Sequence, residues 1–449
     1  MKFQSMISSS VLSLLALLLL SACGSPEKYL QPTGKSAFVP AQEMNFSTYV
    51  EESRRNIEEV LKTVRGEGGY LGGYSTAEAA AMRSPFQLMP SGQQQCQPGT
   101  AKGQRGFLLV HGLTDSPYLL RNIADSLHKA YPCGLIRAVL LPGHGTVVGD
   151  TLTMKKNQWK EIVEYGVKSF QKEEGITELY LIGFSTGTSL ILDYLKTHPS
   201  PIQERRDDAI AGVVFLSAAV KAKTDLAFLA PWIRPFKDWE SIFAERDAAR
   251  YESFSFNAVA EFYSLTKPLD EPAYLPHVPM LMALSADDAT IDAQAARKLF
   301  CSAGKLQRNT LIWYSSLDPQ INTEIRNDPT LSCGNIIERT PSSFAPQYKT
   351  LNMAHTALPV APDDEHYGVN GRYHHCKEYD LGKTEVAFKA CQQDDAAAVY
   401  GENKKLLESE RKLDQKYFRR GTFNPDYEYM MQAIFCFVDQ SCPMETLIR

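Results

Sequence analysis

The chain has 449 residues, of which 44% are hydrophobic and 22% are charged. This is the composition of a globular protein, so a wholly disordered or collagen-like chain is excluded. Lys and Arg number 47 against 52 Asp and Glu, and the resulting net charge of −5 gives no reason to expect nucleic acid as a partner.

The N-terminus has the pattern of an export signal. Lys2 precedes a short apolar run, Val11–Leu20, and small residues follow it. The run is shorter than the ~20 apolar residues that a membrane span needs. It therefore predicts a secretory signal peptide over residues 1–22.

Residues 20–23, Leu-Ser-Ala-Cys, resemble the bacterial lipobox. The resemblance implies that Cys23 is lipidated, for example by palmitate, and anchors an exported protein to a membrane of the bacterial cell envelope. Gly24 and Ser25 follow, without the aspartate that resembles an inner-membrane retention signal, so the outer membrane is expected. Ordinary secretion with cleavage nearby is the alternative. The polar stretch beyond Cys23 predicts a flexible tether over residues 23–45.

An amphipathic helix is predicted at 46–64, within an N-terminal helical extension of residues 46–104. From residue 105, short apolar runs alternate with helical patterns. The predicted strands are 106–110, 136–140, 179–183, 212–217, 279–285 and 310–314, and the predicted helices are 116–130, 154–171, 186–197 and 292–300. Continuous apolar strands alternating with helices indicate an α/β fold with a mostly parallel central sheet covered on both faces.

Two segments interrupt this alternation within a core of residues 105–362. Residues 221–275 are rich in aromatic side chains, and residues 315–350 are polar and contain prolines. The remaining residues, 363–449, hold four cysteines and a predicted helix at 427–438, and are expected to pack on the core as a C-terminal extension.

Apart from Cys23 there are eight cysteines, and an even number in an exported chain suggests disulfides. Sequence alone does not fix their connectivity, and pairing in chain order is the simplest hypothesis. It joins Cys96 to Cys133, Cys301 to Cys333, Cys376 to Cys391 and Cys436 to Cys442. Metal ligation is the competing interpretation, but no metal-type spacing of Cys and His supports it, so no metal is expected.

Residues 183–187, Gly-Phe-Ser-Thr-Gly, form a GxSxG sequence between a predicted strand and a predicted helix. A sharp turn there needs small flanking residues and lifts the oxygen of Ser185 clear of the sheet. The helix that follows directs free N–H groups toward Ser185, where a developing oxyanion is stabilised. A glycine-flanked turn without catalysis is the alternative.

Three segments together resemble the α/β-hydrolase superfamily. Besides the GxSxG sequence, Leu109–Thr114 (LVHGLT) is similar to the family's strand-end His-Gly motif. Leu141–Gly145 (LPGHG) is similar to a segment of monoacylglycerol lipases and related carboxylesterases. The resemblance covers roughly residues 105–220 and 277–360. It implies an α/β-hydrolase fold, a helical cap at about 221–275 over the active site, and the chain order serine, acid, histidine.

Candidates for the acid and the histidine follow Ser185 in that order. Asp287 and Asp288 end an apolar run, and Asp288 is preferred because an apolar residue follows it by three positions, as in the family's acid loop. Asp292 is the more natural helix cap. His355 lies in a segment similar to the family's histidine loop. His366, His374 and His375 form a loose cluster without the spacing of a defined metal site.

These residues have complementary roles in ester hydrolysis. His355 takes the proton of Ser185, and Asp288 fixes the tautomer of His355. The backbone N–H groups of Leu113 and Thr186 form the oxyanion hole. No nucleotide-binding motif occurs, so no cofactor is expected.

The sequence thus predicts a serine hydrolase that cleaves carboxylic esters through an acyl-enzyme intermediate. The aromatic residues of 221–275 favour a small-molecule ester or lipid with an apolar acyl group over a sugar or a charged peptide. An acyltransferase or thioesterase with the same three residues is an alternative, and so is a non-catalytic, lipid-anchored binding module. Protein partners and oligomeric state are not indicated.

Overall fold

The computed structural model describes residues 27–66, 69–91, 96, 104–171, 173, 175–198, 210–269, 278–303, 308–316, 328–331, 333, 335–341, 346–376, 379, 385–402 and 416–440. The predicted signal peptide and the predicted lipidation site, Cys23, lie outside these residues. In the part of the chain that is described, no helix is long and apolar enough to span a membrane.

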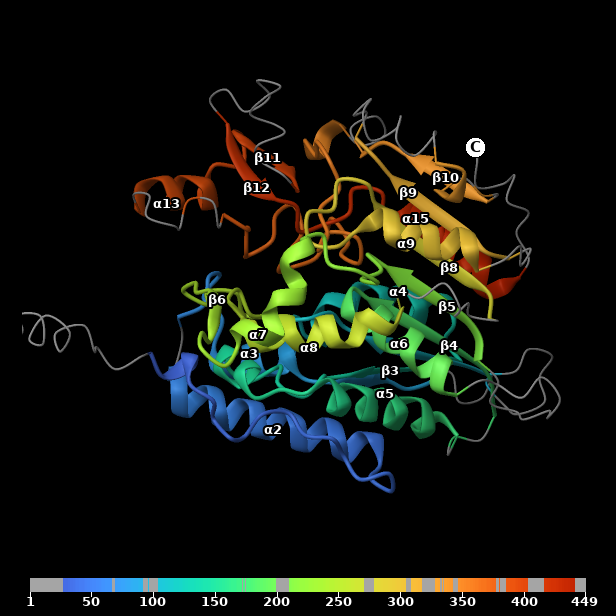
Figure 1. Cartoon of the computed structure of the whole chain (residues 1–449), viewed down its shortest axis with the longest axis horizontal. Helices are drawn as coiled ribbons and strands as arrows, with labels where there is room; N and C mark the ends of the chain where they lie inside the picture. The colour runs from blue at the N-terminus through green and yellow to red at the C-terminus, as the bar shows by residue number, and fades with distance from the viewer. Residues whose placement is uncertain are drawn as a thin grey trace, which may run out of the picture.

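An eight-stranded sheet runs through the centre of the molecule, with helices packed against both faces (Figure 1). Its order is β1-β3-β2-β4-β5-β8-β9-β10, and every neighbouring pair is parallel except β1 with β3. The strands are Phe86–Leu88 (β1), Gln104–Val110 (β2), Leu135–Val139 (β3), Ile176–Phe184 (β4), Ile210–Leu216 (β5), Met280–Ser285 (β8), Thr310–Tyr314 (β9) and Ile336–Arg339 (β10). The predicted α/β class with a mostly parallel sheet is confirmed.

Successive residues of each central strand point to opposite faces of the sheet, and this alternation creates two apolar cores. Leu108 and Val110 of β2 belong to a core with α5, α6 and α9, whereas Phe107 and Leu109 belong to a core with α4 and α15. These helices are Arg121–Ala130 (α4), Lys156–Phe170 (α5), Thr186–Thr197 (α6), Ala293–Ser302 (α9) and Tyr427–Asp439 (α15). Because both faces are buried, the strands read as continuous apolar runs.

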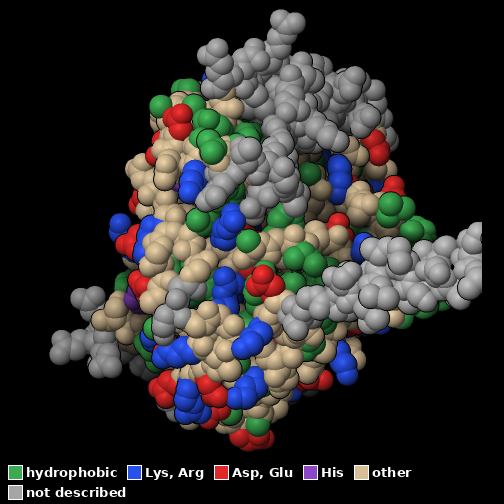
Figure 2. Space-filling view, turned by 90° about the vertical axis from the view of Figure 1, so that its left-hand side faces the viewer, with side chains coloured by type: hydrophobic (Ala, Val, Ile, Leu, Met, Phe, Trp, Pro, Cys, Tyr) green, Lys and Arg blue, Asp and Glu red, His purple; other side chains and the backbone are tan. Residues whose placement is uncertain are grey.

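The N-terminal extension contains the predicted helix, Phe46–Arg65 (α2), and a second one, Thr76–Arg83 (α3). The outer face of α2 carries charges of both signs, such as the Lys62–Glu58 pair, and mixed charges cover the lower part of the face shown in Figure 2. The expected flexible tether over residues 23–45 is wrong for its described part. Leu30 is buried, and Thr33 donates its backbone N–H to Asp150 Oδ1 at 2.7 Å, so this segment is packed on the core.

The polar segment 315–350, expected as an insertion in the core, contributes β10 to the sheet edge. β10 pairs in parallel with β9, and only Ile337 of its four residues is buried. Such a short, half-exposed edge strand gives little apolar pattern in the sequence. The short strand β1 was missed for the same reason.

The C-terminal extension divides into two parts. Helix α15 packs on the sheet beside α4, and the hydroxyl of Tyr180 donates to the carbonyl of Val438 at 3.0 Å. A separate two-stranded parallel ribbon, Ala398–Gly401 (β11) with Tyr417–Arg420 (β12), lies with Glu385–Gln393 (α13) near the carboxyl end of the sheet (Figure 1).

Three disulfides follow the chain-order pairing: Cys96–Cys133, Cys301–Cys333 and Cys376–Cys391. Cys436 is also disulfide-bonded, while Cys442 lies outside the described residues. The Cys301–Cys333 bond links α9 to the chain leading into β10, and so fastens the edge of the sheet to a core helix.

The segment between β5 and β8, where a cap is expected, is called the cap below. Its described elements are the 3₁₀ helix Asp225–Leu229 (η4), Ala230–Ile233 (α7), the short antiparallel strands Trp239–Ser241 (β6) and Phe254–Ser255 (β7), and Phe256–Thr266 (α8). The cap therefore contains a small β-ribbon in addition to the expected helices.

Candidate active site

The turn between β4 and α6 holds Ser185 in a backbone conformation that non-glycine residues rarely adopt, with φ of 51°. Its N–H donates to the carbonyl of Leu216 at 2.9 Å, which ties the turn to the end of β5. Neighbouring glycines permit the close approach: a Cβ on Gly187 would lie 2.0 Å from the carbonyl oxygen of Val110, and one on Gly183 would lie 2.7 Å from the backbone nitrogen of Thr188. The strain at Ser185 is of the kind that collects at functional sites.

The structure brings Ser185, His355 and Asp288 together at the carboxyl end of the sheet. His355 Nε2 lies 2.9 Å from Ser185 Oγ, and His355 Nδ1 lies 2.6 Å from Asp288 Oδ2. All three side chains are buried. A serine, an imidazole and a carboxylate in this linear arrangement can pass a proton from the hydroxyl to the ring while the carboxylate stabilises the charged ring.

The two neighbouring aspartates have different partners. The other oxygen of Asp288 accepts the backbone N–H groups of Thr290 and Ile291 at 2.8 and 2.9 Å, so the whole carboxylate is fixed. Asp287 instead accepts the backbone N–H of Ser316 at 2.9 Å. Asp292 caps α9 by accepting the N–H of Ala295 at 3.1 Å.

Two serines at strand ends hold the histidine loop, and the sequence reading did not single them out. Ser217, just after β5, donates its hydroxyl to the carbonyl of His355 at 2.8 Å. Ser285, the last residue of β8, donates to the carbonyl of Met353 at 2.7 Å. A lone serine after an apolar run carries no distinctive signal, so only the fold reveals this role.

Two buried histidines join the loops beside Ser185. His111 Nε2 accepts the N–H of Leu141 at 3.0 Å, and His144 Nε2 accepts the N–H of Thr114 at 3.0 Å. Burial lowers the pKa of both rings, that of His144 to about 4. Both rings are therefore neutral at neutral pH, as their accepting nitrogens require.

The two residues expected to form the oxyanion hole, Leu113 and Thr186, both line the cavity beside Ser185. Thr186 is the first residue of α6, where backbone N–H groups have no acceptor within the helix. Leu113 lies on the loop that the His144 ring holds through its neighbour Thr114.

A cavity of about 650 Å³ opens from Ser185 toward the cap. The apolar residues of the cap that line it are Leu226, Ala227, Leu229, Ala230, Ile233, Phe254, Phe256, Val259 and Phe262. Only some of the aromatic side chains of the cap line this cavity. Trp232 and Phe236 are 76% and 90% exposed, so they face solvent.

Polar side chains also line the cavity, and they come from the loop after β2, from the cap and from the C-terminal extension. They include Asp115, Arg250, His375 and Arg420. Burial raises the pKa of Asp115 to about 6, although the nearby Arg250 guanidinium opposes the shift. Arg250 donates to His375 Nδ1 at 3.0 Å. None of the four was predicted from the sequence to have a role in the site, because all four lie outside the recognised motifs.

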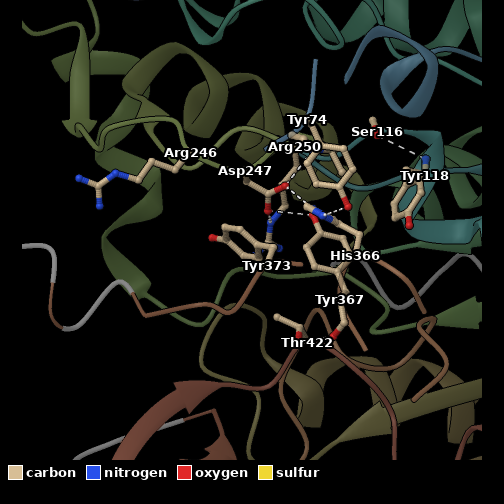
Figure 3. Close-up of polar contacts among 12 residues, drawn as sticks. Tyr74, Ser116, Tyr118, Arg246, Asp247, Arg250, His366, Tyr367, Tyr373 and Thr422 are labelled. Atoms are coloured by element: carbon tan, nitrogen blue, oxygen red, sulfur yellow. Dashed lines mark hydrogen bonds and ion pairs between the residues drawn. The ribbon is translucent and has the colours of Figure 1, made fainter. Parts of the chain in front are cut away.

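A buried network of polar side chains around Asp247 holds Arg250 in place (Figure 3). Asp247 accepts from Arg250 Nε at 3.1 Å and from the hydroxyl of Tyr367 at 2.9 Å, and its Oδ1 lies 2.9 Å from His366 Nε2. The other ring nitrogen of His366 lies 3.0 Å from the hydroxyl of Tyr74. Burial alone would raise the pKa of Asp247, but the partners His366 and Arg250 lower it.

The histidines that form a loose cluster in the sequence therefore bind different side chains in the structure. His366 is bound within this network, and His375 contacts Arg250. Within the described residues, no group of three or more His, Cys, Asp or Glu side chains is arranged to hold a metal ion.

Comparison with known proteins locates these features in a family. A model described as "Alpha/beta hydrolase family" matches residues 107–355. A thermostable monoacylglycerol lipase from Bacillus sp. (strain H-257) is 34% identical over 119 residues, or 26% of this chain and 42% of the lipase. The chain thus spans less than half the length of that relative.

Solved structures that the chain matches in part include enzymes described as lipolytic. A structure from work on the metagenome-derived lipolytic enzymes LipS and LipT has a TM-score of 0.41 at 17% identity, covering 51% of this chain and 86% of that one. The monoacylglycerol lipase of Paleococcus ferrophilus has a TM-score of 0.40 at 18% identity, covering 51% and 88%.

Proposed function

Because the chain belongs to the alpha/beta hydrolase family, we propose that it is a serine hydrolase that cleaves carboxylic esters with apolar acyl groups. The observation that carries the proposal is the alignment of Ser185 Oγ, His355 Nε2 and Asp288 within hydrogen-bonding distance. A hydroxyl alone is a poor nucleophile at neutral pH, and this arrangement supplies the base that it needs.

The reaction follows from these positions. Ser185 Oγ attacks the ester carbonyl carbon while His355 Nε2 accepts the hydroxyl proton. The negative oxygen of the tetrahedral intermediate is stabilised by the N–H groups of Thr186 and Leu113. His355 then gives the proton to the departing alcohol, which leaves an acyl group on Ser185. Water repeats the sequence, frees the acid and restores the serine.

The cavity supports an apolar acyl group. Aliphatic and aromatic side chains of the cap, such as Phe256, Val259 and Phe262, line much of it. An acyl chain that enters the apolar side removes hydrocarbon from water, at roughly 0.8 kcal/mol per buried methylene.

A fluorophosphonate probe tests the proposal, because it reacts only with an activated serine. The wild-type chain should be labelled and should hydrolyse p-nitrophenyl esters. Ser185→Ala should abolish labelling and lower kcat by a factor of about 10⁶. Ser241→Ala, which changes another serine of the same cavity, should leave both unchanged. Folded wild-type protein that takes no label and cleaves no ester would rule the proposal out.

We also infer that the protein is exported and lipid-anchored through Cys23, with the outer membrane as its site. The support is the lipobox-like sequence Leu-Ser-Ala-Cys after a short apolar run. In an envelope fractionation, wild-type protein should be membrane-bound and carry a lipid mass on Cys23. Cys23→Ala should appear in the soluble fraction, and membrane-bound, unlipidated wild-type protein would contradict the anchor.

A further inference from the structure

The C-terminal extension reaches the active site through one buried carboxylate. Glu402 directly follows β11, and its side chain has no exposed surface. Its Oε1 accepts the backbone N–H of Ala289 at 3.1 Å, and its Oε2 accepts the backbone N–H of His355 at 3.4 Å. Ala289 is the residue after Asp288, so a single carboxylate bridges the acid loop and the histidine loop.

An arginine completes the bridge. Arg420, the last residue of β12, donates to both oxygens of Glu402 at 2.8 Å each. It also donates to the hydroxyl of Thr290 at 2.9 Å. Burial alone would lower the pKa of Arg420, but Glu402 raises it, so the guanidinium is charged. A bidentate guanidinium–carboxylate pair has a fixed geometry and is suited to holding two loops in register.

The ribbon that carries this pair is itself joined to both loops. The backbone N–H of Glu402 donates to Asn352 Oδ1 at 2.5 Å, at the start of the histidine loop. The hydroxyl of Thr356 donates to the carbonyl of Gly421 at 3.3 Å, immediately after β12. The pair is therefore part of a local bracket, built from residues outside the family match, around the two loops.

We propose that Glu402 and Arg420 are positioning residues, which hold Asp288 and His355 in line with Ser185. This inference rests on the proposed hydrolase function. Neither residue gives or takes a proton in the reaction; both act through the loops that they bind. Loss of the bracket should therefore lower kcat and leave binding of a small ester almost unchanged, because misplacement by about 1 Å can cost about 100-fold in rate.

The test compares Glu402→Gln and Arg420→Gln with Arg419→Lys. Arg419 is the neighbouring buried arginine, and its partners Cys391, Asp395 and Tyr400 all lie in the extension. Hydrolysis of p-nitrophenyl butyrate gives kcat and KM. Both glutamine variants should lose about 10- to 100-fold in kcat with KM within about twofold of wild type, while Arg419→Lys should retain its kcat.

A pH profile separates positioning from general loss of structure. Glu402→Gln leaves the Arg420 charge uncompensated near Asp288 and His355, which disfavours protonation of the imidazole. The acid limb of kcat/KM should therefore move to lower pH, whereas Arg419→Lys should not move it. Two further carboxylates lie close to His355 in the described chain, those of Asp288 and Asp115. Both are present in all of these variants, so they do not account for a difference between them. The double variant Glu402→Gln/Arg420→Gln should return the limb toward wild type while kcat stays low.

Thr290→Val is a second test in case Glu402→Gln and Arg420→Gln fail to fold. Thr290 is exposed, so this change should not disturb folding. It removes only the bond to Arg420 and should lower kcat a few-fold. Suppose that the wild type is active and is labelled at Ser185. The inference is then overturned if the folded glutamine variants, or Thr290→Val, have the same kcat as the wild type. It is also overturned if Arg419→Lys loses as much kcat as the glutamine variants do. An unlabelled, inactive wild type would instead remove the proposed function itself.

Discussion

Asp287 and Asp288 are neighbours in the chain, yet their carboxylates bind different loops. Asp288 Oδ2 lies 2.6 Å from His355 Nδ1, while Asp287 accepts the N–H of Ser316. We expect Asp288→Asn to lower kcat by a factor of about 10⁴, because an amide at this position favours the wrong tautomer of the histidine.

Asp287→Asn is the matched control for this change. It leaves the Asp288–His355 contact in place and should cost less than about tenfold in kcat, since the bonds that it weakens include those to Ser316 and not the one to His355. Steady-state hydrolysis of a p-nitrophenyl ester measures both variants. Equal losses in the two would contradict the assignment of Asp288 as the acid.

The volume of the cavity predicts a chain-length effect. Val259 lies on α8 and lines the apolar side, so Val259→Trp should fill part of the space that an acyl chain enters. Activity on decanoyl esters should fall by about tenfold or more, while activity on acetyl esters changes little, because each excluded methylene forfeits roughly 0.8 kcal/mol.

Trp232→Ala is the control for Val259→Trp. It removes a large cap side chain that is 76% exposed, and should leave the ratio of decanoyl to acetyl activity unchanged. A ratio that shifts with Trp232→Ala and not with Val259→Trp would show that acyl chains bind elsewhere.

The neutral histidine His144 predicts acid sensitivity. Its folded pKa of about 4 lies below the ordinary 6.5, so its stabilising effect is complete above pH 6.5 and is lost as pH falls toward 4. The protonated ring can no longer accept the N–H of Thr114. We expect the thermal midpoint of the wild type to fall across this range more steeply than that of His144→Gln.

His198→Gln provides the comparison, since this imidazole is exposed near the end of α6. Its midpoint should follow the wild-type curve between pH 6.5 and 4. If the His144→Gln curve also runs parallel to wild type, the ring is not the source of the pH dependence.

The buried Asp247 network predicts a large stability effect. Asp247→Asn replaces an acceptor of bonds from Arg250 and Tyr367 with an amide, and leaves the Arg250 charge without its nearest partner. We expect a loss of about 3–5 kcal/mol in the free energy of unfolding, measured with denaturant. Asp125→Asn breaks an exposed pair with Arg121 and should cost no more than about 1 kcal/mol. Similar losses would argue against the network as a stabilising element.

The strands and helices at the centre of the fold could be predicted from the sequence, because each of them has a local hydrophobic pattern. The buried strands are continuous apolar runs, and α6 was predicted with the bounds Thr186–Thr197 that the structure has. Edge strands such as β10, in which only one of four residues is buried, lack that pattern. The tether was misjudged because composition reports polarity, and a polar segment such as that around Thr33 can still be fixed by hydrogen bonds to the core.

Part of the candidate site could also be predicted from the sequence. Ser185, Asp288 and His355 each follow a recognisable strand end or loop, and the structure brings them together. Arg250 and Glu402 could not be found this way. Their positions depend on how the cap and the C-terminal ribbon fold back on the core, and no short sequence pattern encodes that contact.

The position of Glu402 in the chain has a consequence for biosynthesis. It binds the N–H of His355 from 47 residues downstream, so it leaves the ribosome after every reactive group has already emerged. At about 5–20 residues per second, that interval is roughly 2–10 s. During those seconds the nascent polypeptide holds a serine, a histidine and an aspartate whose loops lack their brace, so full reactivity waits until Glu402 has been synthesised.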